Sequence, residues 1–207
     1  MSHREEILAR IRNALGTRSA ETPPTGGDYK QSGSLTLEGR VELFVDRLHD
    51  YDAVVHSASV PEIAATIATA LTARGKRRIV VPPGFPTEWL PDGFEFLTDD
   101  RFTYHDLDHA DGVLTTCASA IALTGTIILH DGPGQGRRAT SLIPDYHLCN
   151  VHTTQIVETV PEAFRSLSGG TWRSITTISG PSATSDIEMT RIRGVHGPRT
   201  LEVVLVG

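Results

Sequence analysis

The segment with the densest chemistry lies near the C-terminal end, between residues 178 and 199, and reads ISGPSATSDIEMTRIRGVHGPR. Its two Gly-Pro pairs predict turns. The hydroxyls of Ser182 and Thr184 can cap the free N–H groups of a short helix that begins near Asp186. Because such a helix start also binds anions, the segment predicts an anion site. The same hydroxyls could instead cap only their own backbone, which would leave a polar loop without an assigned reaction.

A glycine-rich loop is the second candidate, and it reads HDGPGQGRRATS from residue 130. Its glycines are spaced G-x-G-x-G and not G-x-G-x-x-G, and Pro133 removes one N–H donor, so a phosphate cradle is not indicated. The loop predicts a flexible segment that brings Arg137 and Arg138 over a site, where each guanidinium could hold a carboxylate or a phosphate. The alternative is a solvated loop with surface arginines.

A third candidate is the run Thr124-Gly125-Thr126, which stands where a predicted helix gives way to a strand. A glycine at such a junction lets a ligand approach the backbone, and threonine can donate a hydroxyl. The alternative is that Gly125 only ends the helix.

Metal and covalent chemistry receive little support from the sequence. His147 and Cys149 fall on one face of a predicted strand and His152 on the other, so the three side chains do not converge and no metal site is predicted. The chain has no G-x-S-x-G motif, and neither cysteine has a predictable histidine partner. No covalent nucleophile is therefore visible.

Composition narrows the class of protein. The net charge of −6 is modest and mixed along the 207 residues, which argues against a nucleic-acid surface. Two cysteines exclude a disulfide framework and a four-thiolate cluster within this chain, so no cofactor is assigned to it. The charged N-terminal start and the lack of a long apolar run predict a cytoplasmic protein without a membrane span.

The hydrophobic pattern divides the chain into three regions. Residues 1–16 predict a basic amphipathic helix that Gly16 ends, and it could dock on the body of the protein or bind a membrane surface or a partner. Residues 17–34 are rich in Pro, Gly, Ser and Thr and predict a flexible linker. Residues 35–207 predict one α/β domain.

Within this domain, helical and strand patterns alternate in the first half, and strands dominate the second. Helices are expected at 41–48, 60–74, 117–123 and 161–167, and strands at 53–55, 77–81, 94–97, 111–115, 126–129, 146–151, 174–178 and 201–206. Helix-length segments between short apolar strands indicate βαβ units. The fold class is therefore α/β with a mainly parallel, mixed sheet.

Five stretches together resemble a known family. They are residues 110–138, SLIPDYHLCNV from residue 141, QIV from 155, ISGPSATSDIE from 178 and GVHGPRTLEVVL from 194. This set resembles the LUD domain family, of the lactate utilization protein C type. The last two stretches are its most specific features. The resemblance covers the second half of the chain closely and the first half in layout.

The resemblance implies a three-layer α/β/α fold of the NagB/RpiA/CoA transferase-like kind. It also implies a complex subunit that supports oxidation of L-lactate to pyruvate with iron–sulfur partner proteins, which would carry the clusters. One departure is visible, because Leu123 stands where the family usually has a glutamate. If that acid is used in relatives, this chain has lost or moved it.

The leading hypothesis is thus a lactate-utilisation subunit with a pocket for a small anion or a nucleotide. Glu188 and His196 are the candidate acid and base. The candidate ligand-binding residues are Thr124, Gly125, Thr126, Arg137, Arg138, Ser182, Thr184, Asp186 and Gly197. Two alternatives stay open: a free-standing acyl-CoA or phosphosugar-type transferase or isomerase, and a non-catalytic regulatory or assembly module, which Leu123 favours.

Overall fold

The computed structural model describes residues 3–16, 29–169, 174–181, 183–185, 191–193 and 197–207. Its centre is a six-stranded sheet in which every neighbouring pair of strands is parallel. In sheet order the strands are β1 (Val54–Ala58), β12 (Thr200–Val206), β7 (Tyr146–His152), β4 (Gly112–Thr116), β2 (Arg78–Val81) and β3 (Glu95–Thr98). Nearly every residue of β12, β7 and β4 is buried, as expected where both faces of a parallel sheet are covered.

One face of this sheet is covered by α3 (Ile63–Ala73), which follows the short 3₁₀ helix η1 (Val60–Glu62). Ile63, Ile67 and Leu71 recur at helical spacing and are fully buried against the sheet. The second 3₁₀ helix on this face, η2 (Thr87–Trp89), packs Trp89 against the same cluster. This face forms one of the two large parts of the hydrophobic core.

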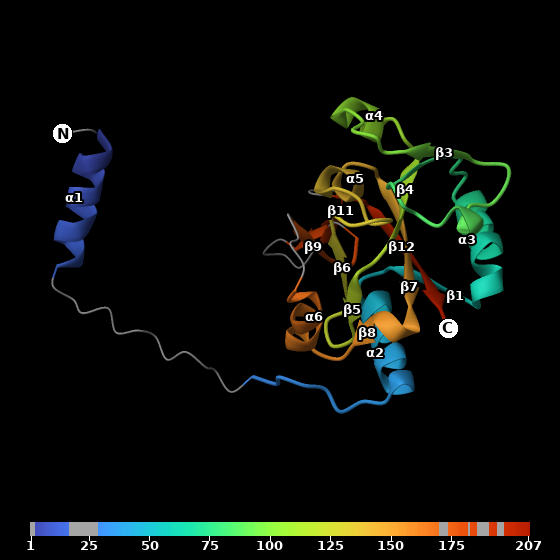
Figure 1. Ribbon diagram of the computed structural model, residues 1–207, viewed down its shortest axis with the longest axis horizontal. Coiled ribbons are helices and arrows are strands. Elements are labelled where there is room, and N and C mark those ends of the chain that lie inside the picture. Colours follow the sequence, from blue (N-terminus) through green and yellow to red (C-terminus); the bar gives the residue numbers. More distant parts are fainter. Residues whose placement is uncertain (1–2, 17–28, 170–173, 182, 186–190, 194–196) are drawn as a thin grey trace.

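The other face packs against α2 (Leu37–Asp50) and a second, four-stranded sheet. Thr36 caps α2 by accepting a hydrogen bond from the Gly39 N–H at 3.2 Å, and Phe44 and Leu48 bury its inner face. The second sheet has the order β8 (Ile156–Val157), β5 (Ser119–Ile121), β6 (Thr126–His130) and β9 (Ile175–Ser179). The 3₁₀ helix η3 (Thr153–Gln155) leads from β7 into β8. Helix α6 (Val160–Leu167) covers the outer face of this sheet (Figure 1).

Four shorter elements belong to the domain. They are α4 (Tyr104–Asp108), α5 (Arg138–Leu142) and the antiparallel pair β10 (Ala183–Ser185) with β11 (Arg191–Arg193). The predicted α/β class with a mainly parallel sheet and helices on both sides is confirmed. The antiparallel pairings are gathered in the second sheet and the β10–β11 hairpin.

The predicted helix over residues 117–123 is wrong. This segment contains β5, which pairs with β6 in an antiparallel hairpin and with β8 in parallel. Its alanine and leucine content favours a helix locally, but burial between two strands outweighs that preference. The junction at Thr124-Gly125-Thr126 is accordingly a hairpin turn and not a helix end, and Gly125 takes φ +59° within it.

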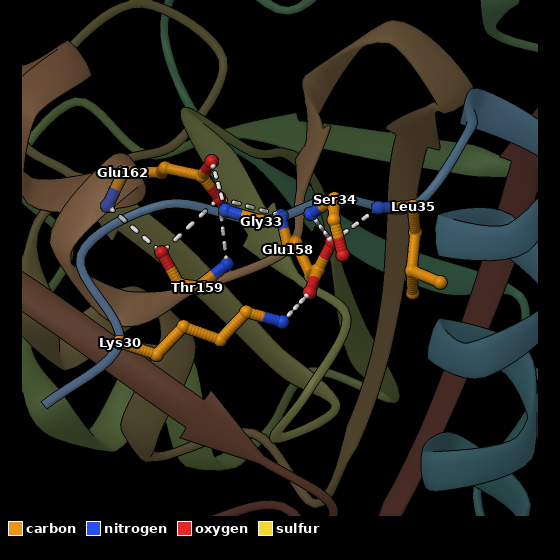
Figure 2. A network of polar contacts seen from close by, with 7 residues as sticks. All are labelled: Lys30, Gly33, Ser34, Leu35, Glu158, Thr159 and Glu162. Carbon is orange, nitrogen blue, oxygen red and sulfur yellow. Dashed lines mark hydrogen bonds and ion pairs between the residues drawn. The ribbon is translucent and has the colours of Figure 1, made fainter.

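A strap of residues 30–35 binds the N-terminal end of α6 through two carboxylates (Figure 2). Buried Glu158 accepts hydrogen bonds from the backbone N–H groups of Ser34 at 2.6 Å and Leu35 at 2.7 Å, and it pairs with Lys30. Glu162 accepts from the Gly33 N–H at 2.7 Å. The last residues of the predicted linker are therefore held on the domain, immediately before α2 begins.

The predicted N-terminal helix corresponds to α1 (His3–Leu15), which stands apart from the domain in Figure 1. Its Ile7 and Ile11 side chains are about half exposed, at 53% and 49%. Among the helices of the described residues, none combines the length and the apolar character that crossing a bilayer requires.

Candidate functional site

A hollow of about 360 Å³ lies between β9, α5 and two Gly-Pro turns. It brings together the glycine-rich loop region and the C-terminal polar segment, which are separate stretches of the sequence at residues 130–141 and 178–199. The residues that line it are Arg138, Ser141, Leu142, Ile175, Thr176, Thr177, Ile178, Ser179, Gly180, Pro181, Gly197 and Pro198. We refer to this set as the β9 pocket.

The β9 pocket combines one cation with several hydroxyl groups. The Arg138 side chain is exposed and forms no ion pair with any other residue that the structure describes. Ser141, Thr177 and Ser179 contribute hydroxyls, each of which can donate or accept a hydrogen bond. A free guanidinium beside hydroxyl donors is suited to a small carboxylate or phosphate.

A chain of hydroxyls links the hairpin turn to this pocket. The Thr126 hydroxyl lies 2.7 Å from the Ser179 hydroxyl and 2.7 Å from that of Thr124. Thr126 is buried and pairs with Ser179 across β6 and β9. Thr124 and Thr126 therefore lie behind the pocket wall and orient Ser179, while Gly125 packs against the backbone of Arg47.

Arg137 points away from the β9 pocket. Its guanidinium donates to both carboxylate oxygens of Asp99, at 3.0 and 3.1 Å, and to the Phe102 carbonyl at 2.5 Å. Asp99 also accepts hydrogen bonds from the Thr140 hydroxyl and from the Phe102 N–H. Burial raises the pKa of Asp99, but the bonds from Arg137 and Thr140 outweigh it and bring the pKa below its ordinary 3.8.

The glycine-rich loop is held against the carboxyl ends of two parallel strands. The Gly134 N–H donates to the Pro83 carbonyl after β2, and the Gly134 carbonyl accepts from Thr116 at the end of β4, both at 2.8 Å. A Cβ at Gly134, which has φ +74°, would come within 2.8 Å of the Thr116 hydroxyl oxygen. A separate hollow of about 440 Å³ on this side is lined by Asp99, Arg137 and neighbouring loop residues. The loop thus does not present both arginines to one site.

The remaining predicted site residues divide between the β9 pocket, strand β10 and the part of the chain outside the described residues. Gly197 lines the β9 pocket. Thr184 lies on strand β10, which pairs with β11, and the helix start expected near Asp186 lies outside the described residues. Four predicted site residues lie outside the described part of the chain: Ser182, Asp186, Glu188 and His196. Their proposed roles stay predictions.

Sequence reasoning missed the pocket hydroxyls of Thr177 and Ser179 and the anchoring role of Asp99. Thr177 and Ser179 alternate on the exposed side of β9, a pattern readable in the run ITTIS. Asp99 directly follows β3, a position where side chains of a parallel sheet meet loops from neighbouring strands. Its partner Arg137 lies 38 positions later, so no local pattern joins them.

His147, Cys149 and His152 on β7 do not converge on one point in the structure. Buried His147 places its Nε2 2.7 Å from the Thr115 hydroxyl, and Cys149 lies beside it on the same face. His152 lies on the opposite face of the strand, as predicted, and its ring contacts that of Trp89. Within the described ranges, no three His, Cys, Asp or Glu side chains come close enough to share a metal ion.

Buried Cys117 is poorly suited to act as a nucleophile. A hydrogen bond with Cys149 and burial raise the pKa of the Cys117 thiol well above its ordinary 9.0. The thiol is also almost completely inaccessible, at 3% exposure. It therefore packs as a small apolar side chain in the core between the two sheets.

Comparison with protein families matches residues 2–206 to the LUD domain. The chain belongs to the LUD domain family. Lactate utilization protein C of Deinococcus radiodurans is 45% identical over 206 residues, which are 98% of this chain and 94% of that protein. Lactate utilization protein C of Bacillus pumilus is 37% identical over 225 residues, covering 96% and 94% of the two chains.

A solved structure has the same fold as this LUD domain. The crystal structure of a DUF162 family protein from Deinococcus radiodurans superimposes with a TM-score of 0.72 at 43% sequence identity, and it covers 84% of this chain and all of that one. Within the fold, Leu123 lies on the exposed turn between β5 and β6 and is 42% exposed. Leu123 therefore lies at the surface, at a turn that the strap approaches through Glu158.

Proposed function

We propose that this LUD domain chain is a component of lactate utilisation and supports the oxidation of L-lactate to pyruvate. The observation that carries the proposal is the similarity to lactate utilization protein C of Deinococcus radiodurans, which extends over nearly the whole of both chains. Similarity over that length places every described element of the fold within the aligned region, including the strands that surround the β9 pocket.

The β9 pocket is the proposed binding site for a small carboxylate. Arg138 supplies the positive charge, and the hydroxyls of Ser141 and Ser179 can bond to the carboxylate or to the 2-hydroxyl of lactate. Because the Thr126 hydroxyl lies 2.7 Å from that of Ser179, the β6 strand fixes the direction of one of these groups. Such a site favours a small 2-hydroxy or 2-oxo acid over a neutral ligand.

The electrons of the reaction are proposed to pass to iron–sulfur partner proteins. Oxidation of a secondary alcohol to a ketone removes a pair of electrons and a pair of protons, which need an acceptor. The chain has two cysteines, both buried, and cannot supply the four thiolates of an iron–sulfur cluster. This composition supports a division in which partners hold the clusters and this chain contributes binding or assembly.

Growth of a deletion strain tests the role. Loss of the gene is expected to abolish growth on L-lactate as sole carbon source and to leave growth on pyruvate unchanged. Normal growth of the deletion strain on both carbon sources would refute the role in lactate utilisation.

Co-purification tests the partners separately. The full chain, tagged at its C-terminus and recovered from lactate-grown cells, is expected to bring down cysteine-rich proteins that contain iron and labile sulfide and reduce a dye when L-lactate is added. An iron-free preparation that turns over an acyl-CoA or a phosphosugar by itself would contradict the partner proposal and support the free-standing enzyme.

A further inference from the structure

A shallow apolar groove lies between the first turns of α2 and η3. Leu37 and Val41 form its floor one helical turn apart, and Glu38, Glu42 and Thr153 line its sides. We call these five residues the α2 groove; its volume is about 460 Å³. Leu37 is 37% exposed although it is a large apolar side chain, so the groove leaves apolar surface in contact with water.

The α2 groove continues into a second hollow at the carboxyl ends of β1 and β12. The two hollows share Val41 and Thr153, and the second adds Leu205, Glu62 and the Ser57–Ser59 segment. The extended groove therefore has apolar residues along its floor and three carboxylates at its edge, from Glu38, Glu42 and Glu62. This combination suits a helix with an apolar stripe bordered by positive charge.

Helix α1 has that character. Ile7 and Ile11 are one turn apart and half exposed, and they form an apolar row along the helix. Arg4 and Arg12 lie in the adjacent row, on either side of Leu8, and neither forms an ion pair with another described residue. By contrast, Arg10 is paired with Glu6 at 2.9 Å. The unpaired arginines therefore border the exposed apolar row.

The strap fixes where the tether of α1 is attached. Glu158 and Glu162 hold residues 30–35, and the chain enters α2 at Leu37, inside the α2 groove. The connection over residues 16–29 can reach at most about 50 Å when fully extended. Helix α1 therefore stays within that reach of residue 30, and this tether raises its local concentration at the groove, which favours docking within one chain over docking between chains.

We propose that α1 docks in the α2 groove of its own chain, with Ile7 and Ile11 against Leu37 and Val41 and with Arg4 and Arg12 facing Glu38 and Glu42. Docking covers apolar surface on both sides and pairs charges that are otherwise exposed. An isolated helix of thirteen residues is marginal in water, so docking would also stabilise α1 itself. This inference is independent of the proposed role in lactate utilisation.

Amide hydrogen exchange of residues 3–15 in the full chain tests the proposal. Leu37→Asp places a charge on the groove floor and is expected to speed exchange of the α1 amides about tenfold. Tyr104→Asp is the matched control, because Tyr104 is also an exposed apolar side chain at the first position of a threonine-capped helix. It is expected to leave exchange in α1 unchanged. Equal exchange of α1 in the wild type and in Leu37→Asp would overturn the proposal.

Charge reversal gives a second test that does not depend on the groove floor. Glu38→Lys with Glu42→Lys is expected to release α1, and adding Arg4→Glu with Arg12→Glu is expected to restore protection of its amides. Failure of the combined variant to restore protection would contradict the pairing. Protection that grows with protein concentration and accompanies a dimeric mass in light scattering would show that the occupant is the α1 of a second copy, which would overturn docking within one chain.

Discussion

Asp99 accepts two hydrogen bonds from the Arg137 guanidinium, one on each carboxylate oxygen, at 3.0 and 3.1 Å. This pair joins the end of β3 to the start of α5 and fixes the C-terminal end of the glycine-rich loop, which connects β6 to α5. It also separates two arginines that are neighbours in the sequence. Arg137 is used to hold the loop, and Arg138 is left to face the β9 pocket.

Replacing Asp99 with asparagine is expected to destabilise the fold. The buried carboxylate accepts bonds from Arg137, Thr140 and the Phe102 N–H, and an amide can satisfy only some of them. Because the Arg137 side chain is 38% exposed, we expect a loss of about 2 kcal/mol, less than for a fully buried pair. Urea unfolding measures it. Glu95→Gln, which breaks an exposed pair with Arg78, is the control and should change stability by less than about 0.5 kcal/mol. Equal effects of the two variants would contradict the role given to Asp99.

Two glycine-to-alanine changes are expected to have opposite effects: one should loosen the strap, and the other should stabilise the protein. A Cβ at Gly33 would overlap the Glu158 side chain, so Gly33→Ala should displace the strap and speed amide exchange of residues 30–35. A Cβ at Gly39, inside α2, meets no atom closer than 3.6 Å. Gly39→Ala should therefore stabilise the protein by about 0.5–1 kcal/mol. Unchanged exchange of the strap in Gly33→Ala would show that Glu158 does not define its position.

The stabilisation that Glu158 gives to the strap should depend on pH. The bonds from Lys30 and the Leu35 N–H hold the pKa of Glu158 below its ordinary 4.5. A carboxylate whose pKa is lower in the folded state adds stability that is complete above the unfolded value and is lost as the pH falls through the folded value. The difference in unfolding free energy between the wild type and Glu158→Gln should therefore shrink from pH 7 to about pH 3.

Exposed Glu88 provides the control for this pH dependence. Glu88→Gln should follow the wild type at every pH in the same urea titrations. A gap between the wild type and Glu158→Gln that stays constant down to about pH 3 would contradict an ionised Glu158 as the anchor of the strap.

The parallel sheet could be predicted from the sequence because most of its strands are short, largely apolar segments between helical patterns. A continuous apolar run such as 203–206 leaves little alternative to a strand covered on both faces. Strand β5 was predicted as a helix because its three residues obtain their strand character from pairing with β6 and β8. Strand pairing between distant segments is a tertiary property that local pattern does not contain.

The site was only partly predictable for a similar reason. Arg137 and Arg138 are indistinguishable in their local sequence, and what separates them is an aspartate that precedes Arg137 by 38 positions. Gly197 and Arg138 were both predicted to serve the same site, and the structure brings them to one pocket. The pattern S-x-T-x-D predicts a cap locally, but the pairing of Thr184 with Ile192 across β10 and β11 joins residues that no local pattern connects.

Complementation of the deletion strain with Arg138→Met tests most directly that this chain serves lactate utilisation through the β9 pocket. Arg77→Met, at an exposed arginine distant in sequence from the pocket, is the matched control, and both proteins must accumulate to the wild-type level. The expected result is that Arg77→Met restores growth on L-lactate and Arg138→Met does not, while both strains grow equally on pyruvate. Full growth of the Arg138→Met strain on L-lactate would contradict the account.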